Sequence, residues 1–292
     1  MKRRAPSPNR IGLALAIAAC GAARDPAAPP EVSSPTEAEL EEAADPVSSA
    51  PSEVQQWVAE HAIPIATVEA GHGFDDLASL KNIVGDARIV ALGESTHGTR
   101  EFFQLKHRML EFLVTQMGFT VFAIEASMPE AYAIDEYVVH GRGDAATALA
   151  GTYFWTWNTA EVLAMIEWMR AYNADPAHTE KLRFYGFDMQ YAPVAMARVL
   201  DYLRRVDSHA VKGTAAKVAP LLDAFALDQL HAQTQPDWRR RVAAVASLAK
   251  RFDAQRIPWI ARTDVTSFET ARQDLRVVEQ WLSLFQPGPA SE

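Results

Sequence analysis

The sequence predicts an α/β fold with a parallel βαβ sheet as its core and a helical lobe after the sheet. Three runs rich in apolar, β-branched and aromatic residues, at 87–92, 119–125 and 181–188, have the length and composition of buried strands. Segments with helical periodicity separate them, and from about 192 to 285 the pattern is helical almost throughout. Strands that alternate with helices favour parallel pairing through crossover helices, so the lobe should pack on or beside the sheet.

The helices predicted before the lobe span 52–65, 100–118, 129–139 and 159–174. The helix over 100–118 has apolar residues at helical spacing, and Gly118 suits its C-cap. The spacing predicts that one side of this helix faces the sheet. The stripe on that side consists of Phe102, Met109, Leu113 and Met117.

Composition limits the classes of function. At 292 residues the chain is long enough for one large domain or two modest ones, and 49% hydrophobic residues suffice for a core. The formal net charge of −9 argues against a nucleic-acid partner, since phosphates require a basic face. The single cysteine, Cys20, leaves no pair for a disulfide.

The N-terminus has the pattern of an export signal. Basic residues precede the apolar run 11–19, which is too short to span a bilayer as a helix, and Cys20 follows it. The ending "IAAC" resembles a bacterial lipobox, in which the cysteine is lipidated and becomes the first mature residue. We therefore expect a lipoprotein signal peptide over 1–19 and a secreted protein that Cys20 anchors to the cell envelope, at the periplasmic face or in the outer membrane. A plain signal peptide with a chance cysteine is the alternative.

A tether is predicted between this signal and the folded part. Residues 20–52 are rich in Ala, Pro, Ser and Glu, a composition that buries little surface. The globular domain is therefore expected over 53–292, with the helical lobe at about 192–285.

Polar residues stand at the ends of the three predicted strands. Glu94 and the loop carrying His97 follow the first, Glu125 ends the second, and Asp188 ends the third. In open α/β sheets, ligands bind beyond the carboxyl ends of the strands. One acid at such a position is most often a helix cap, but charges at three strand ends are costly without a partner or a purpose. These four residues are therefore predicted to form one site.

The residue types favour activation of water over a covalent nucleophile. In "GESTHG", His97 stands where the nucleophile-elbow motif requires glycine, and the chain has no HExxH, P-loop or GxGxxG motif. A neutral imidazole can take a proton from a water that attacks a carbonyl, and Glu94 would orient it. Lys106, on the stripe that faces the sheet, is a candidate for stabilising the oxyanion. The alternative is a metal site in which Glu94, His97 and Glu125 are the ligands.

Three segments then indicate a family. "VALGESTHGTREFFQLKHRMLEFLVTQMGFTVFAIEASMPEAYAIDEYV", "TYFWTWNTAEVLAMIEWMRAYN" and "LRFYGFDMQ" resemble the erythromycin esterase family, from about Trp57 to the end and most strongly over 90–190. The resemblance implies an α/β core with a helical lobe, and a hydrolase without metal or cofactor. Such a hydrolase opens the lactone ring of a macrolide with a histidine-activated water, which can give macrolide resistance.

The resemblance also assigns roles to single residues. The general base falls on His97 and the acid of the G-E-x-x-H motif on Glu94. The acid after the second strand falls on Glu125, and a basic residue, arginine in some members, falls on Lys106. Thr96 and Asp188 are further candidates, for substrate binding. Thr96 also suits capping of the following helix, and the G-[FI]-D position of Asp188 suits a mostly structural role.

One family feature has no counterpart in this sequence. A later strand with a His-Asn-x-His-like segment completes the family's site, whereas the last histidine here is His231. We therefore expect that the domain is C-terminally incomplete or that its cleft is completed differently. A catalytically impaired homologue that binds an amphipathic ligand is the corresponding alternative function.

Overall fold

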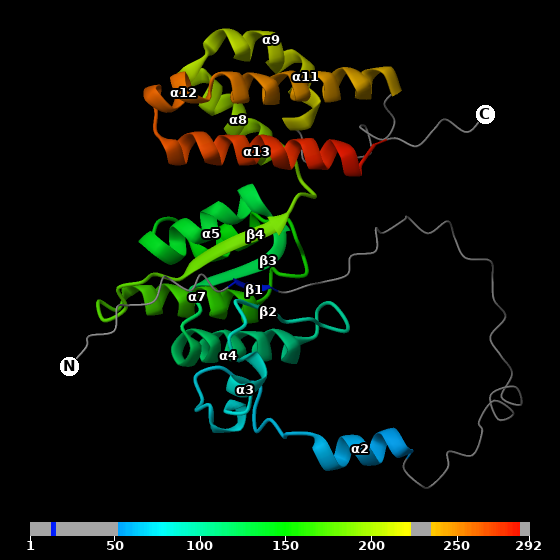
Figure 1. The fold of residues 1–292 in the computed structure, drawn as a ribbon, viewed down its shortest axis with the longest axis vertical. Helices are drawn as coiled ribbons and strands as arrows, with labels where there is room; N and C mark the ends of the chain where they lie inside the picture. The colour runs from blue at the N-terminus through cyan, green and yellow to red at the C-terminus, as the bar shows by residue number, and fades with distance from the viewer. Residues whose placement is uncertain (1–12, 16–51, 223–234, 287–292) are drawn as a thin grey trace, which may run out of the picture.

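The computed structural model describes residues 13–15, 52–222 and 235–286, a mostly helical α/β protein with a small parallel sheet (Figure 1). Within that part, the strands lie in the order β2–β1–β3–β4, and each neighbouring pair is parallel. They are β1 (Leu13–Leu15), β2 (Ile89–Ala91), β3 (Val121–Ser127) and β4 (Arg183–Asp188). The three predicted strands are confirmed. A helical crossover joins β3 to its neighbour β4, but β1 separates β2 from β3, so the predicted βαβ core is present only in part.

Strand β1 comes from the segment that the sequence predicts to lie outside the fold. Leu13 pairs with Ile89 of β2 on one side and with Val121 of β3 on the other. The structure thus differs from the prediction that residues 1–19 take no part in the fold. The apolar composition of an export signal is also that of a buried parallel strand, so composition alone does not separate the two. Export and processing remain predictions, and the tether, like Cys20, lies outside the described residues.

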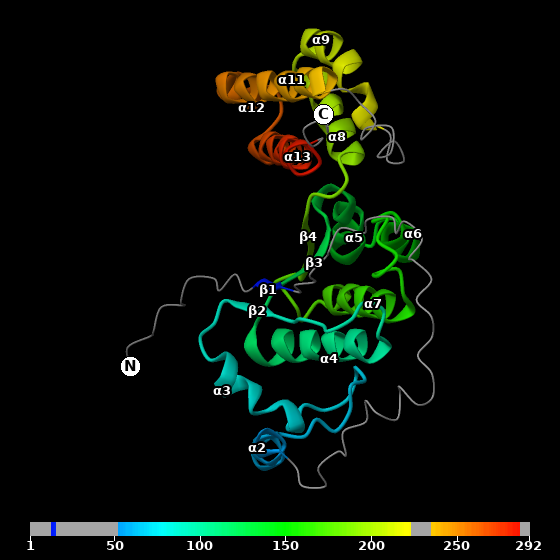
Figure 2. The same ribbon diagram turned by 90° about the vertical axis from the view of Figure 1, so that its right-hand side faces the viewer.

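Helices cover one face of the sheet. They are α4 (Arg100–Met117), α5 (Met128–His140), α6 (Ala145–Ala150) and α7 (Ala160–Ala174). Figure 2 shows α5, α6 and α7 on the same side of β3 and β4. Phe122 and Ile124 of β3 and Phe184 of β4 pack with these helices in one apolar core. The predicted helices over 100–118, 129–139 and 159–174 are therefore confirmed, with ends shifted by a residue or two.

The buried face of α4 differs from the predicted stripe. The α4 side chains that join the sheet core are Phe103, Leu110 and Val114. Of the predicted stripe, Leu113 alone is fully buried, in a separate small core, and the other three are half-buried. The predicted sheet-facing side of α4 was wrong by one residue. Helix α4 is buried on most of its circumference, so the spacing of its apolar residues does not identify which side faces the sheet. Lys106, three positions after Phe103, still faces the sheet.

The segment before β2 is tied to α4 by an arginine. This segment contains α2 (Glu53–His61), the 3-10 turn η1 (Asp75–Leu77) and α3 (Leu80–Val84). Arg108 of α4 is buried, and its guanidinium donates to both carboxylate oxygens of Asp76 at 2.6 and 2.9 Å and to the Thr67 carbonyl. The predicted helix over 52–65 is confirmed but ends at His61. None of the described helices has both the length and the apolar character that crossing a membrane requires.

The predicted helical lobe is confirmed as a unit with its own core. It comprises α8 (Pro193–Val206), α9 (Ser208–Val218), η2 (Ala219–Leu222), α11 (Gln235–Ala254), α12 (Arg256–Arg262) and α13 (Val265–Leu284). Its core includes Trp238, Phe252 and Trp259. Figures 1 and 2 show the lobe beyond the carboxyl end of β4, beside the sheet rather than on its face. The indole of Trp281 in α13 donates to the Gln190 carbonyl in the β4–α8 loop at 2.9 Å, which ties the lobe to that edge.

Candidate active site

The loop between β2 and α4 carries the central residues of the candidate site. Gly98 has a φ of 77°, in the left-handed region that glycine adopts without strain, so the chain turns there before α4 begins at Arg100. The hydroxyls of Thr96 and Thr99 lie 2.7 Å apart and close the same turn. This turn places Glu94 and His97 at the carboxyl end of β2, where the sequence predicts them.

Glu94 is held by two cationic or protonatable partners. Its Oε1 lies 2.7 Å from Nδ1 of His97, and its Oε2 accepts a hydrogen bond from Nζ of Lys106. The Glu94 side chain is 2% exposed and that of Lys106 is 9% exposed, whereas the His97 ring is partly open to solvent. A carboxylate removed from water needs such partners, and both of its oxygens have one here.

This arrangement determines the chemistry of the imidazole. When Nδ1 donates to a carboxylate, the lone pair of the neutral ring is on Nε2, so Nε2 is the nitrogen that takes a proton. The carboxylate also stabilises the imidazolium that forms. The ring is therefore oriented as a general base, the role the sequence predicts for His97.

Lys106 has a more indirect position than the sequence predicts. Its ammonium contacts Glu94 and lies over the rings of Phe103 and Trp157, 5.6 and 5.7 Å from their centroids. This places it as a group that holds Glu94 rather than one that contacts the reacting carbonyl. An ammonium on Glu94 also repels a metal cation, which disfavours the metal-ligand alternative for Glu94 and His97.

Glu125 lies in β3, the strand whose end the sequence predicts to contribute to the site. Strand β3 continues to Ser127, so Glu125 is two residues before the strand end, not at it. Its side chain is buried, and the pairing of β3 with β4 is irregular between Ile124 and Ser127, the stretch that contains it. The Trp157 indole donates to the Glu125 backbone carbonyl at 2.6 Å and lies 6.1 Å from the His97 ring, centroid to centroid. This contact involves the backbone of Glu125, so a catalytic role for its carboxylate stays a prediction.

The two predicted substrate-binding residues make local contacts. The Thr96 hydroxyl is in the turn before α4, as described above. The Asp188 carboxylate accepts from the Met189 amide at 2.8 Å and from the Gln190 side chain at 2.6 Å. These contacts shape the β4–α8 loop and favour the mostly structural role for Asp188. Binding of substrate by either residue stays a prediction.

Sequence reasoning did not assign a role to two tryptophans beside His97. Trp155 and Trp157 both approach the imidazole edge to face, with ring centroids 6.4 and 6.1 Å away. Both lie in the segment 151–158 between α6 and α7. The signal was the density of aromatic residues in "TYFWTW", but nothing local to that run indicates that it lies against a loop more than fifty positions earlier.

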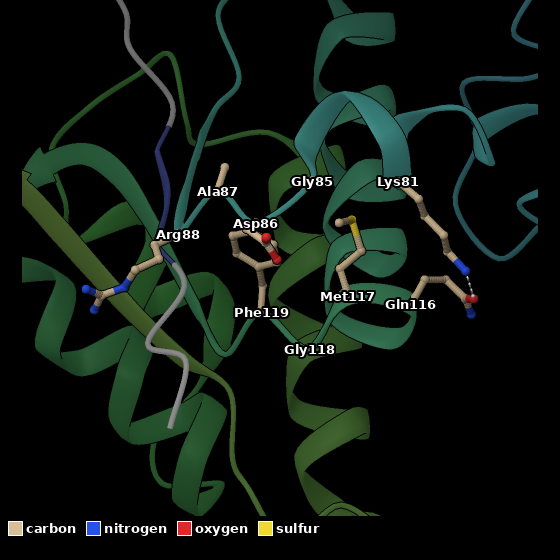
Figure 3. Close-up of a pocket in the computed structure, with 9 residues that line it drawn as sticks. All are labelled: Lys81, Gly85, Asp86, Ala87, Arg88, Gln116, Met117, Gly118 and Phe119. Atoms are coloured by element: carbon tan, nitrogen blue, oxygen red, sulfur yellow. Dashed lines mark hydrogen bonds between the residues drawn. The ribbon is translucent and has the colours of Figure 1, made fainter. Parts of the chain in front are cut away.

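A pocket of about 270 Å³ lies at the amino ends of the strands, at the opposite end of the sheet from Glu94 and His97 (Figure 3). It lies before the amino end of β2, near the C-terminal ends of α3 and α4, and is lined by Lys81, Gly85, Asp86, Ala87, Arg88, Gln116, Met117, Gly118 and Phe119. Parallel strands run from this edge toward Glu94. The pocket is therefore separate from the candidate site.

The fold and the Glu94–His97 pair define a candidate water-activating hydrolase with an α/β core, and comparisons with known proteins support the hydrolase class. The sequence profile of the erythromycin esterase family matches residues 114–291. The chain is 31% identical over 230 residues to Erythromycin esterase type II from Escherichia coli, covering 74% of this chain and 53% of that protein. It belongs to the erythromycin esterase family of hydrolases. Glu94, His97 and Lys106 precede the segment that the profile matches.

One further relative supports the hydrolase class, and two solved structures support the fold. The putative hydrolase YbfO from Bacillus subtilis is 30% identical over 46% of this chain and 28% of its own length. A crystal structure of a Bacillus cereus protein matches 80% of this chain and 56% of its own, with a TM-score of 0.70 and 28% identity. A mutant of the erythromycin esterase EreC in its open conformation has a TM-score of 0.59 at 17% identity over 73% and 53% of the two chains, which shows the fold alone. The chain thus spans about half the length of the Escherichia coli relative and of the Bacillus cereus and EreC structures.

Proposed function

We propose that this protein hydrolyses carboxylic esters, and that its substrate is a macrolide-like lactone. The observation that carries the proposal is the buried Glu94 carboxylate with His97 on one oxygen and Lys106 on the other. Membership in the erythromycin esterase family supports hydrolysis of an ester bond. The name of the Escherichia coli relative, Erythromycin esterase type II, supports a macrolide-like lactone as the substrate.

The proposed reaction uses water and the side chains of this site. Nε2 of His97 takes a proton from water as the water oxygen attacks the carbonyl carbon, which gives a tetrahedral oxyanion and an imidazolium. Glu94 stabilises the imidazolium, and Lys106 holds the Glu94 carboxylate in place through its hydrogen bond. The intermediate then collapses, the bond to the alkoxide oxygen breaks, and that oxygen takes the proton from His97. A linear ester gives an acid and an alcohol, whereas a lactone gives one open-chain hydroxy acid.

The test is hydrolysis of erythromycin and of p-nitrophenyl acetate by the purified chain, with His97→Ala as the catalytic variant. We expect a loss of about 10²- to 10⁴-fold in kcat, the usual contribution of a general base. His209→Ala, which removes an exposed histidine of the lobe, is the matched control and should retain activity. If neither ester is hydrolysed, or if His97→Ala retains full activity, the proposal is wrong. Stabilisation by erythromycin without turnover would instead favour the ligand-binding alternative.

We also propose that the protein is a secreted lipoprotein anchored through Cys20, on the lipobox-like ending of the apolar run 11–19. Cleavage before Cys20 would remove β1 (Leu13–Leu15), so the proposal requires that the mature sheet forms without this strand. Metabolic labelling with a radioactive fatty acid should mark the expressed protein and fail with Cys20→Ala. Unlabelled protein in the soluble periplasmic fraction would favour a plain signal peptide.

A further inference from the structure

The segment between α6 and α7 presents an exposed indole beside the proposed general base. Trp157 in this segment is 2% exposed, whereas Trp155, two residues earlier, is 75% exposed. Both rings stand nearly perpendicular to the imidazole of His97, at interplanar angles of 81° and 86°. One indole therefore supports the base from inside the protein, and the other borders it on the solvent side.

Contacts from the sheet edge hold this segment in its conformation. Tyr153 has a φ of 61°, a left-handed conformation that is unfavourable for a residue with a side chain and persists where neighbours impose it. The rings of Tyr153 and Phe154 each lie 5.7 Å from that of Tyr191 in the β4–α8 loop. The amide of Tyr191 donates to Ser127 at the end of β3 at 3.0 Å, so the loop is itself fixed to the sheet.

The exposed indole is therefore placed before any ligand arrives. A single exposed tryptophan is not unusual by itself. Trp155 differs because its backbone is fixed and its ring lies 6.4 Å from the ring that would activate water. A large, rigid aromatic surface binds apolar groups with little loss of conformational entropy.

We propose that the exposed face of Trp155 binds the apolar body of the ester substrate while its carbonyl lies at His97. The inference rests on the proposed esterase function and narrows its substrate class. It predicts a preference for esters and lactones with an extended aliphatic surface next to the carbonyl over short acyl esters, because a short acyl group does not reach the indole. Trp155 then determines specificity, and His97 performs the chemistry.

The experiment compares p-nitrophenyl decanoate with p-nitrophenyl acetate for the unmodified protein, Trp155→Ala and Trp155→Phe. In Trp155→Ala, kcat/KM for the decanoate divided by kcat/KM for the acetate should fall by about tenfold. The main cause should be a higher KM for the decanoate, because the indole binds the acyl chain equally well in the ground state and in the transition state. Phenylalanine should restore most of the ratio. Trp57→Ala, at an exposed tryptophan of α2, is the matched control and should leave the ratio unchanged. An equal loss on both esters, or no change in the ratio, overturns the proposal.

A binding measurement separates this inference from the proposed function. In a His97→Ala background, calorimetric titration with erythromycin should show affinity about tenfold lower when Trp155→Ala is added. If the unmodified chain hydrolyses no ester but this difference in affinity is present, the esterase proposal fails and the role of Trp155 in ligand binding stands. If esters are hydrolysed and the affinity does not change, the role of Trp155 fails and the esterase stands.

Discussion

Glu94 Oε1 and His97 Nδ1, three positions apart in the loop after β2, lie 2.7 Å from each other. The other carboxylate oxygen accepts from Lys106, so one buried acid links the exposed base to a buried cation. Removing the acid therefore has two separable consequences, one for the tautomer of His97 and one for the charge left on Lys106.

Glu94→Gln tests both consequences. An amide cannot stabilise an imidazolium as a carboxylate does, so kcat should fall by about 10²-fold or more. The variant also leaves the ammonium of Lys106 buried without a counter-charge, which should lower the free energy of unfolding by roughly 3 kcal/mol. Activity assays and urea denaturation measure the two effects.

The double variant Glu94→Gln with Lys106→Met separates them. Methionine removes the unpaired charge and retains most of the volume, so it should recover most of the lost stability without recovering kcat. Recovery of activity in the double variant would contradict the assigned role of Glu94.

Glu130, in the first turn of α5, should make the protein less stable as the pH rises from about 4.5 to about 8. Burial, followed by the negative charge of Asp274 on α13, raises the pKa of its carboxyl from 4.5 to about 8, against the opposing charge of Arg198 on α8. The unfolded chain loses this proton near pH 4.5, and the folded chain holds it to about pH 8. The free energy of unfolding should therefore fall by up to about 1.4 kcal/mol per pH unit between these values and level off above pH 8.

Glu130→Gln checks this expectation, since an amide does not ionise. Urea denaturation at pH 6.5, 8 and 9 should show the variant gaining stability relative to the unmodified protein as pH rises to 8, with only a small further gain at 9. Glu60→Gln, at an exposed acid of α2, should show no such trend.

His107 in α4 should make the protein less stable as the pH falls below about 6.5. Burial lowers the pKa of its imidazole from 6.5 to about 4. Between pH 6.5 and 4 the unfolded chain binds a proton that the folded chain does not, so protonation favours unfolding as pH falls through this range. The unmodified protein should lose roughly 3 kcal/mol of stability across it from this group.

His107→Phe removes this dependence and retains a ring beside Trp168, whose centroid is 6.0 Å from that of His107. The measured quantity is the difference in unfolding free energy between variant and unmodified protein at pH 7, 5.5 and 4.5, because the contribution of Glu130 has the opposite sign above pH 4.5. The difference should grow as pH falls. His209→Phe, at an exposed position in the lobe, should give a constant difference.

Gly186 allows β4 to pair with β3. A Cβ at this position would overlap the carbonyl oxygen of Ala126 and lie 2.9 Å from that of Ser127, both backbone atoms of β3 that cannot move aside. Gly186→Ala should lower the free energy of unfolding by more than about 2 kcal/mol. Gly213→Ala in α9 meets nothing within 4 Å and should raise it slightly, since alanine favours helix. Equal effects of the two substitutions would contradict this assignment.

The sequence located strands and helices well where their signals are local. Gly118 ends α4 with a φ of 74°, and the Thr159 hydroxyl accepts from the Val162 amide to begin α7. These interactions join residues within one turn, so composition and spacing predict them. The buried face of α4 was not predicted, because it depends on how many elements surround the helix.

The same distinction applies to the site. The sequence by itself determined the loop that carries Glu94 and His97, since a strand, a turn and a helix start follow one another within about twelve positions. Only the tertiary structure decided that Trp155 and Trp157 flank His97 and that Lys106 is engaged by Glu94. It also decided that Glu130 is buried without a hydrogen-bond partner for either carboxylate oxygen within the described residues. The burial of a side chain and its electrostatic interactions depend on residues far away in the sequence, so a local sequence pattern does not predict them.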